Sequence, residues 1–361
     1  MDLAALVRWR MHRQLLWGSE ARSPEDVIGH LGASQGQDYL PGTWSLAQRC
    51  RVVPEHTVVD GALDDGRILR THVLRPTWHL VAPSALPWLL AATAPRVHQV
   101  NKHYYREVEV DEELMARVRP VLDDLLSDHH ASRDEVRRAL ADAGIEATGV
   151  RLAYLLMWAE LEAWIVSGRR AGKQQTYALV EERVPDFVLP PRDEALGRLA
   201  TCYFTSRGPA TVRDLARWAT LTIAEATQAR DVAGDALEDL EVDGRRYLVG
   251  AGQTPPPRPT DTGALRTDLV QQYDEIGMSY GESRDVMAGD QKLTFGPDSG
   301  FYHPVIVDAH LAGFWRYQRD GSGRPEAVET RADDAVSNAH LDDAVRAFSL
   351  FAGGPVEHRF V

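Results

Sequence analysis

Hydrophobic and polar positions repeat along the chain in one order, in which short helices precede two strands joined by a turn. The clearest copy starts at Ser132, where SRDEVRRALADAG predicts a helix with a serine cap, a glutamate three residues later and Gly144 as its stop. VRLAYLLMWAELEAW follows with apolar residues at helical spacing. IVSG and QTYALV then predict a hairpin with a basic turn. This order is typical of a winged helix-turn-helix unit.

A second copy covers about residues 193–249. After a first helix come TVRDLARWA, TIAEATQARDVAGD and LEDLEVDGRRYLV, and in the last of these Asp243-Gly244 predicts a tight hairpin turn. The helix in the recognition position carries three acidic residues, Glu225, Asp231 and Asp235. Because the major groove is lined by phosphates, an acidic helix is a poor fit there. We therefore expect this unit to be architectural.

The N-terminal part predicts the same components with an enlarged middle. The expected elements are a helix over 2–17, a helix opened by Ser23-Pro24-Glu25, a segment 32–51, a helix over 57–65, and strands over 67–72 and 77–81. Insertions of this kind commonly carry function. The enlarged middle is therefore the first place to look for a site.

The predicted fold class is mainly α with β (α+β), with three tandem winged helix-turn-helix units and a C-terminal β-rich domain. Strands and turns alternate after about residue 265, and proline-rich linkers are predicted at 184–192 and 254–262. The expected divisions are 1–116 for the enlarged unit, 117–188 for the unit with the basic wing, 189–253 for the third unit, and 263–361 for the β-rich domain.

Length and composition narrow the class of protein. The 361 residues are 44% hydrophobic, which is enough for a sizeable core. Cys50 and Cys202 have no CxxC or histidine partner at ligand spacing, so we expect neither a disulfide nor a metal, and no cofactor. No apolar run reaches membrane-spanning length, and basic residues interrupt the apolar N-terminus. We expect a cytoplasmic monomer that is nucleoid-associated when bound to DNA, with no membrane partner.

The charge is unevenly distributed. The formal net charge is −13, yet residues 1–106 hold 12 basic and 9 acidic residues and seven of the 13 histidines. A neutral-to-basic front on an acidic body allows one face to contact DNA, because electrostatic fields act locally.

Two glutamines in the enlarged segment are the first candidate site. Gln35 and Gln37 are two residues apart, so on an extended stretch both side chains point the same way. An amide can hold a water but is too weakly basic to deprotonate it, so the bond to be broken must already be primed. Asp38 could supply negative charge to stabilise a cationic sugar. The alternative is a polar turn between two helices.

Three further groups could contact DNA. Each group also has a purely structural interpretation, which in the order given below is an amphipathic strand, a solvated turn and a helix surface. The groups are Arg75, Thr77 and His79 beside Trp78; the basic turn Arg169, Arg170, Lys173 and Gln174; and Lys102 with His103. The sequence contains no Walker loop, GxGxxG, GxSxG or HExxH motif.

Several of these segments together resemble the winged-helix DNA glycosylases of the AlkZ and YcaQ type. The resemblance covers nearly the whole chain and rests on Gln35-Gly36-Gln37-Asp38-Tyr39, Leu69-Arg70-Thr71, the run from Arg75 to Pro83, the run from Gln175 to Leu179, the run from Leu189 to Leu196, and Tyr273-Asp274-Glu275. It implies a C-shaped clamp around duplex DNA, in which a Gln-x-Gln motif serves the hydrolysis of N7-alkylguanine nucleosides. By resemblance, Gln35 and Gln37 take those roles.

The second position of the motif separates two branches of the resemblance. The YcaQ branch has an acid there, whereas Gln37 favours the AlkZ branch. Members of that branch are associated with self-resistance in producers of DNA-alkylating natural products, where they remove bulky adducts or unhook interstrand crosslinks. Gly36 departs from the family's usual apolar or small residue. The resemblance thus implies a monofunctional glycosylase acting on double-stranded DNA that carries alkylated bases. The alternatives are a non-catalytic DNA-binding protein, such as a drug-responsive regulator, and a phosphoesterase, for which no metal or nucleophile constellation is present.

Overall fold

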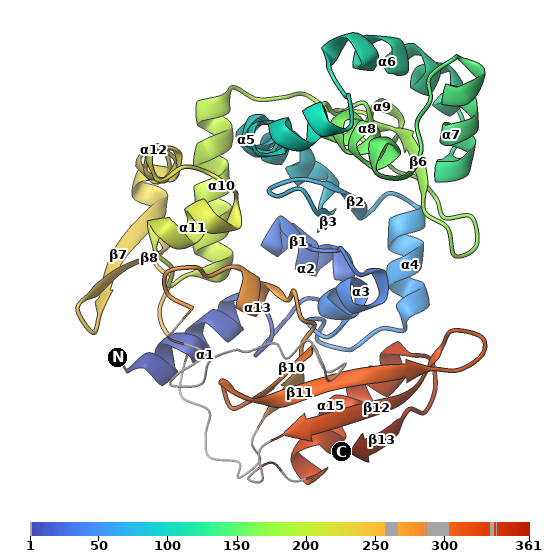
Figure 1. Cartoon of the computed structure of the whole chain (residues 1–361). Coiled ribbons are helices and arrows are strands. Elements are labelled where there is room, and N and C mark those ends of the chain that lie inside the picture. Colours follow the sequence, from blue (N-terminus) through green and yellow to red (C-terminus); the bar gives the residue numbers. More distant parts are fainter. Residues whose placement is uncertain (1, 257–265, 285, 287–302, 333–335, 337) are drawn as a thin grey trace.

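The N-terminal group of elements, apart from its first helix, lies at the centre of the molecule (Figure 1). The computed structural model describes residues 2–256, 266–284, 286, 303–332, 336 and 338–361. The predicted helices and strands of this group are present, and its enlarged segment contains a short strand and a helix. The elements are α1 (Leu3–Arg13), α2 (Pro24–Leu31), β1 (Ala33–Gln35), α3 (Tyr39–Ala47), α4 (His56–Asp64), β2 (Leu69–His72) and β3 (Trp78–Val81).

A long helix, α5 (Leu86–Glu107), leads from this centre to the second group. Ser132 caps α7 through the predicted capping box with Glu135, and Gly144 follows the helix at φ +72°. The predicted helix pair and hairpin are confirmed. The elements are α6 (Glu112–Leu126), β4 (Ala131–Ser132), α7 (Arg133–Asp142), α8 (Gly149–Leu161), β5 (Ile165–Ser167), β6 (Thr176–Leu179) and α9 (Val180–Arg183).

The third group also contains the predicted helices and hairpin. Asp243 and Gly244 both have positive φ, as a two-residue hairpin turn of the favoured type requires. The elements are α10 (Arg192–Arg207), α11 (Val212–Trp218), α12 (Ile223–Ala233), β7 (Leu237–Val242) and β8 (Arg245–Gly250), with a 3-10 turn at Gly234–Ala236. A second 3-10 turn, Pro83–Ala85, lies between β3 and α5.

The three groups share one strand arrangement. The two three-stranded sheets have the orders β1-β3-β2 and β4-β6-β5, so the strand before the helices pairs with the last strand of the hairpin. In the third group Ala210 pairs in the same way with Leu248 of β8. The repeat seen in the hydrophobic pattern is therefore a repeat of topology.

The C-terminal part forms one five-stranded sheet of order β13-β12-β11-β10-β9. This confirms the predicted β-rich character, but a helix of 14 residues, α15, was not predicted. Residues 257–265, which include most of the expected proline-rich linker, lie outside the described residues. The elements are β9 (Thr267–Leu269), α13 (Glu275–Met278), β10 (His303–Val307), β11 (His310–Arg319), β12 (Pro325–Ala332), α15 (Asn338–Phe351) and β13 (Glu357–Phe360).

Two large apolar cores, among the described residues, hold these parts together. One extends from the N-terminal group into the third group and the C-terminal sheet, and includes Trp44, Trp218, Trp315 and Phe348. A second core belongs to the region from Tyr105 to Leu179. The enlarged segment thus sits where three parts of the chain share one core. Among the described residues, no helix is both long and apolar enough to cross a membrane.

Candidate active site

The loop that carries the two glutamines is bent by one arginine. Arg70, on β2, donates from Nε to the carbonyl oxygen of Gly36 at 2.8 Å and from its NH2 group to that of Gln37 at 3.0 Å. Successive carbonyls of an extended strand point to opposite sides. Because a single guanidinium binds both, the chain leaves the strand direction after Gln35, where β1 ends.

The bend separates the two glutamine side chains. Gln35 is 3% exposed, and its Nε2 donates to Thr77 Oγ1 at 3.3 Å, while its Oε1 has no partner among the described residues. Gln37 is exposed, and its Oε1 accepts from the backbone N–H of Trp78 at 3.2 Å. The expectation that both side chains point the same way is therefore wrong, since it assumed an extended backbone through Gly36.

Glycine at position 36 allows close packing on both sides of the loop. A Cβ there would lie 3.1 Å from the backbone nitrogen of Leu80, which is tighter than ordinary contacts. On α3, a Cβ at Gly42 would lie 3.2 Å from the Cα of Gly36. The helix thus rests directly on the loop, and the two glycines make this contact possible.

Asp38 occupies the N-cap position of α3, but its side chain makes no capping hydrogen bond. Its Oδ2 instead accepts from Gln272 Nε2 at 3.1 Å. A carboxylate is electrostatically favoured at a helix N-terminus. Gln272, in the C-terminal part of the chain, thus holds the Asp38 carboxylate at a position that the helix N-terminus favours.

Gln37 and Asp38 line a cavity of about 980 Å³ between the N-terminal group, the β5–β6 hairpin and the C-terminal sheet. The hairpin and the glutamine loop, which are far apart in the sequence, thus belong to one cavity. The other lining residues are Tyr39, Leu40, Pro41, His56, Asp60, Arg70, Arg170, Lys173, Gln272, His303, Tyr317, Arg319, Ser322, Gly323, Arg324, Pro325 and Ala352.

Basic side chains outnumber acidic ones in this lining, although the whole chain is acidic. Arg170 forms an ion pair with Asp60 of α4 at 3.0 Å, and its guanidinium lies 5.0 Å from the ring centroid of Tyr39. Lys173 donates to the carbonyl oxygen of Ser322 at 2.8 Å, in the turn between β11 and β12. The basic hairpin therefore contacts both other walls of the cavity.

Tyr39 and His303 are held in their neutral forms. Burial, helped by the nearby Asp60 carboxylate that accepts from the hydroxyl at 2.7 Å, raises the pKa of Tyr39 well above its ordinary value. Burial lowers the pKa of His303 to about 4. Aromatic groups without charge thus stand among the cations of the cavity.

The other predicted DNA contacts of the hairpin and α5 are exposed. Arg169 and Gln174 are exposed on the hairpin, where Arg169 lies 3.4 Å from Asp65. Lys102 and His103 are exposed on α5, and His103 lies 3.1 Å from Glu107. These four residues do not line the cavity.

Arg75, Thr77 and His79 are not among the residues that line this cavity. His79 is fully buried, and this burial, with the adjacent Arg75, holds its pKa well below the ordinary value. Arg75 donates to the carbonyl oxygen of Trp218 at 2.8 Å. A direct DNA contact by His79 is therefore not compatible with this structure, and Arg75 holds α11 rather than facing the cavity.

Sequence reasoning did not select several cavity residues. Arg70 could have been recognised from its place in the Leu69-Arg70-Thr71 motif, but its hydrogen bonds to the loop could not. Five more come from the C-terminal part of the chain, namely Gln272, His303, Tyr317, Arg319 and Arg324. Among the described residues, no group of three or more His, Cys, Asp or Glu side chains is placed to hold a metal ion.

A family model described as DNA glycosylase AlkZ-like matches residues 28–351. The chain belongs to the AlkZ-like DNA glycosylase family. This AlkZ-like protein is 26% identical over 325 residues to an interstrand DNA cross-link repair glycosylase of Streptomyces sahachiroi, covering 85% of each chain. Its structure is similar to that of the Streptomyces sahachiroi DNA glycosylase AlkZ, with a TM-score of 0.75, 18% identity and 100% of each chain covered.

The family assignment identifies the activity and the kind of substrate. The AlkZ-like protein is a DNA glycosylase, and DNA is its substrate. The match of folds extends over the complete chain, including the C-terminal sheet that forms one wall of the cavity. The glutamine loop falls within the matched residues.

Proposed function

We propose that this glycosylase hydrolyses the N-glycosidic bond of N7-alkylguanine in double-stranded DNA, and that Gln37 and Asp38 act on the reacting atoms. The observation that carries the proposal is that both side chains line one basic cavity at the start of α3. A basic surface suits the phosphates on either side of a damaged nucleotide.

The proposed reaction needs no strong base. The bond between C1′ and N9 breaks, and its electron pair passes to the base, where it neutralises the positive charge created by alkylation at N7. A water oxygen forms a bond to C1′, and one water proton is released. The products are a neutral N7-alkylguanine and an abasic sugar. Because the leaving group is already activated, positioning of water and stabilisation of the cationic sugar supply the remaining catalysis.

The two side chains have different roles in this scheme. Gln37 Oε1 already accepts from Trp78, so the amide NH2 is the part that donates to the attacking water. Asp38 supplies the negative charge that stabilises the sugar cation and accepts the released proton. Only one Asp38 oxygen, Oδ2, binds Gln272 among the described residues, which leaves Oδ1 to face the substrate.

Gln35 has a supporting role in the proposal. Its side chain is buried beside Thr77, at the base of the loop, rather than in the cavity lining. We propose that it fixes the end of β1, where the loop that carries Gln37 and Asp38 begins. Its Oε1 has no hydrogen-bond partner among the described residues, and we propose that this atom accepts a hydrogen bond when the loop binds DNA.

The size of the cavity favours adducts larger than a methyl group. A volume of about 980 Å³ lies at the upper end for pockets that bury a drug-sized ligand. Bulky adducts and interstrand crosslinks are therefore proposed substrates, and the similar Streptomyces sahachiroi protein is an interstrand DNA cross-link repair glycosylase. We propose repair and self-resistance as the biological role, with the enzyme acting as a monomer.

The test compares duplexes that differ only in the lesion. Duplex DNA containing N7-methylguanine, a bulky N7 adduct or an N7–N7 crosslink is incubated with the enzyme, and released base is quantified by mass spectrometry. We expect release of the alkylated guanine and none from unmodified duplex. No release above the spontaneous rate from any of the three, with an active AlkZ-family control, would refute the proposal.

A further inference from the structure

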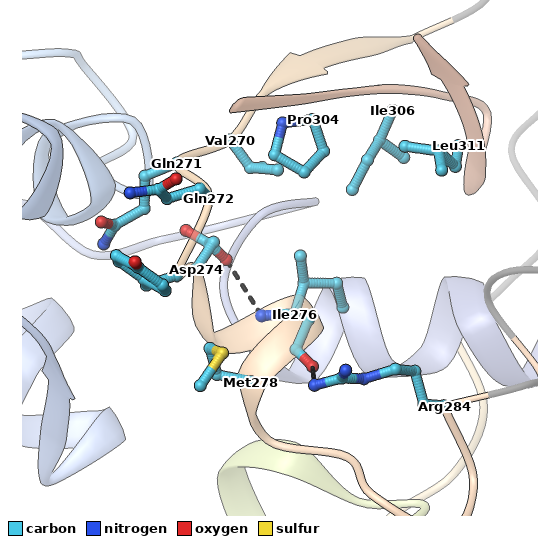
Figure 2. A pocket seen from close by; sticks show the side chains of 12 residues that line it. Val270, Gln271, Gln272, Asp274, Ile276, Met278, Arg284, Pro304, Ile306 and Leu311 are labelled. Atoms are coloured by element: carbon cyan, nitrogen blue, oxygen red, sulfur yellow. Dashed lines mark hydrogen bonds between the residues drawn. The ribbon is translucent and has the colours of Figure 1, made fainter. Parts of the chain in front are cut away.

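Five consecutive residues of the C-terminal part, Gln271–Glu275, contact the loop that carries Gln35 and Gln37. This stretch, here called the brace segment, connects β9 to α13. Figure 2 shows it from the side of a second cavity of about 300 Å³, where Gln271, Gln272 and Asp274 appear beside apolar side chains. The hydrogen bonds that join this segment to Gln35 and Asp38 each connect residues more than 200 positions apart.

The brace segment holds both backbone groups of Gln35. Gln271 Nε2 donates to the carbonyl oxygen of Gln35 at 3.1 Å. The backbone N–H of Gln35 donates to Glu275 Oε1, also at 3.1 Å. The last residue before the bend is thus fixed by two partners from one short segment.

The same segment holds Asp38 on the other side of the bend. Gln272 donates from its side chain to Asp38, and its own backbone N–H donates to His303 Nδ1 at 3.1 Å. That bond requires the His303 proton to be on Nε2. The position of the Asp38 carboxylate is therefore set by the first residue of β10 through Gln272.

Two buried ion pairs anchor the brace segment itself. Asp274 pairs with Arg49 at 2.6 Å, and Glu275 pairs with Arg207 at 3.0 Å; all four side chains are at most 1% exposed. Arg207 also donates to the carbonyl oxygen of Ala33 at 2.6 Å, at the start of β1. Buried pairs contribute little net stability, but they oppose any alternative geometry that would leave a charge unpaired.

We infer that the brace segment is the positioning element of the catalytic loop, and that Gln272 acts by orienting the Asp38 carboxylate toward the substrate. The inference rests on the proposed role of Asp38 and adds a residue that does not touch the reacting atoms. Asp274 and Glu275 anchor the segment, whereas Gln272 is half-buried and contacts the loop only through its amide. Removal of that amide should therefore misplace the carboxylate without unfolding the protein.

The test uses Gln272→Leu in the full-length protein, since leucine approximates the shape of glutamine but cannot donate a hydrogen bond. Tyr273→Phe is the matched control, because it changes an exposed neighbour in the same segment. We expect kcat on N7-methylguanine DNA, measured under multiple-turnover conditions, to fall roughly 10- to 100-fold, because a small misplacement of a catalytic group has an effect of this size. KM should stay within about twofold. Tyr273→Phe should keep the wild-type kcat.

Amide hydrogen exchange of the peptide spanning residues 33–39 gives a second readout that needs no catalysis. Gln272→Leu should raise exchange in this peptide, and Tyr273→Phe should not. If the wild-type enzyme proves inactive on every alkylated duplex, the proposed function fails while the exchange result still decides whether the segment orders the loop. Wild-type kcat in Gln272→Leu, or wild-type exchange in it, would overturn the inference.

Discussion

The guanidinium of Arg70 donates to the carbonyl oxygen of Gln37 at 3.0 Å, and this bond decides which of the two glutamines reaches the cavity. Together with the bond to Gly36, it turns the chain so that Gln37 is exposed and Gln35 is buried. A residue that never enters the Gln-x-Gln motif thus determines the geometry of the motif.

Replacement of Arg70 by lysine should disrupt the loop while keeping the charge. Lysine cannot reproduce the fork that binds two carbonyl groups, and hydrogen bonds to charged groups contribute about 1.5–3 kcal/mol each. We expect a loss of about 1–3 kcal/mol in the free energy of unfolding, measured by urea titration, together with lower activity. A variant with wild-type stability and full activity would show that the fork is dispensable.

Loss of the Glu275 carboxylate should destabilise the protein far more. Glu275→Ala leaves Arg207 charged, buried and without its acid, and breaking such a pair costs about 3–5 kcal/mol. Chemical denaturation measures the change. Asp239→Ala, which breaks an exposed pair with Arg246 at 2.7 Å, is the control and should shift the midpoint little. Equal effects of the two changes would contradict the assigned role of the buried pair.

Local signals were sufficient to predict most elements of the fold. Ser132 with Glu135, and Asp243 with Gly244, specify a helix start and a hairpin turn within a few residues, and both are present. Helix α15 was missed although Leu341, Val345 and Phe348 recur at helical spacing, because the alternating strands before it dominated the interpretation.

The geometry of the site could not be predicted in the same way. The bend at Gly36 depends on Arg70, 34 residues later, and the position of Asp38 depends on Gln272, 234 residues later. The residue types of the motif were readable, but the direction of each side chain is set by contacts that no local pattern encodes. The burial of Gln35 and His79 follows from the same cause.

The hairpin lysine should contribute one phosphate contact. Lys173 is exposed at the cavity, and its only partner in the described part of the chain is the carbonyl of Ser322. For Lys173→Ala we expect weaker DNA binding and a salt dependence whose slope, log K against log salt, is smaller in magnitude by about 0.9. Arg246→Ala, in the third group, serves as the control. An unchanged slope for Lys173→Ala in fluorescence anisotropy would remove the hairpin from the DNA-binding surface.

The C-terminal sheet should lose stability on acidification. Because burial lowers the pKa of His303 from 6.5 to about 4, the unfolded chain binds a proton between these values that the folded chain does not. The contribution of neutral His303 to the free energy of unfolding is complete above pH 6.5. It is lost as the pH falls toward 4, and the loss is on the order of 3 kcal/mol.

Unfolding free energies measured from pH 4 to 7 test this expectation. His303→Gln should flatten the profile, because its amide oxygen can still accept from Gln272 but does not titrate. His310→Gln, at an exposed histidine of the same sheet, should retain the wild-type profile. A profile for His303→Gln as steep as that of the wild type would contradict the prediction.

The most direct test of the account is the single-turnover rate of base release from N7-methylguanine duplex by Gln37→Ala and Asp38→Asn. If these side chains position water and stabilise the sugar cation, each variant should lose at least about 100-fold in rate while its DNA affinity stays within about twofold. Gln228→Ala, at an exposed glutamine of the third group, is the control and should match the wild type. Wild-type rates in both Gln37→Ala and Asp38→Asn would contradict the account.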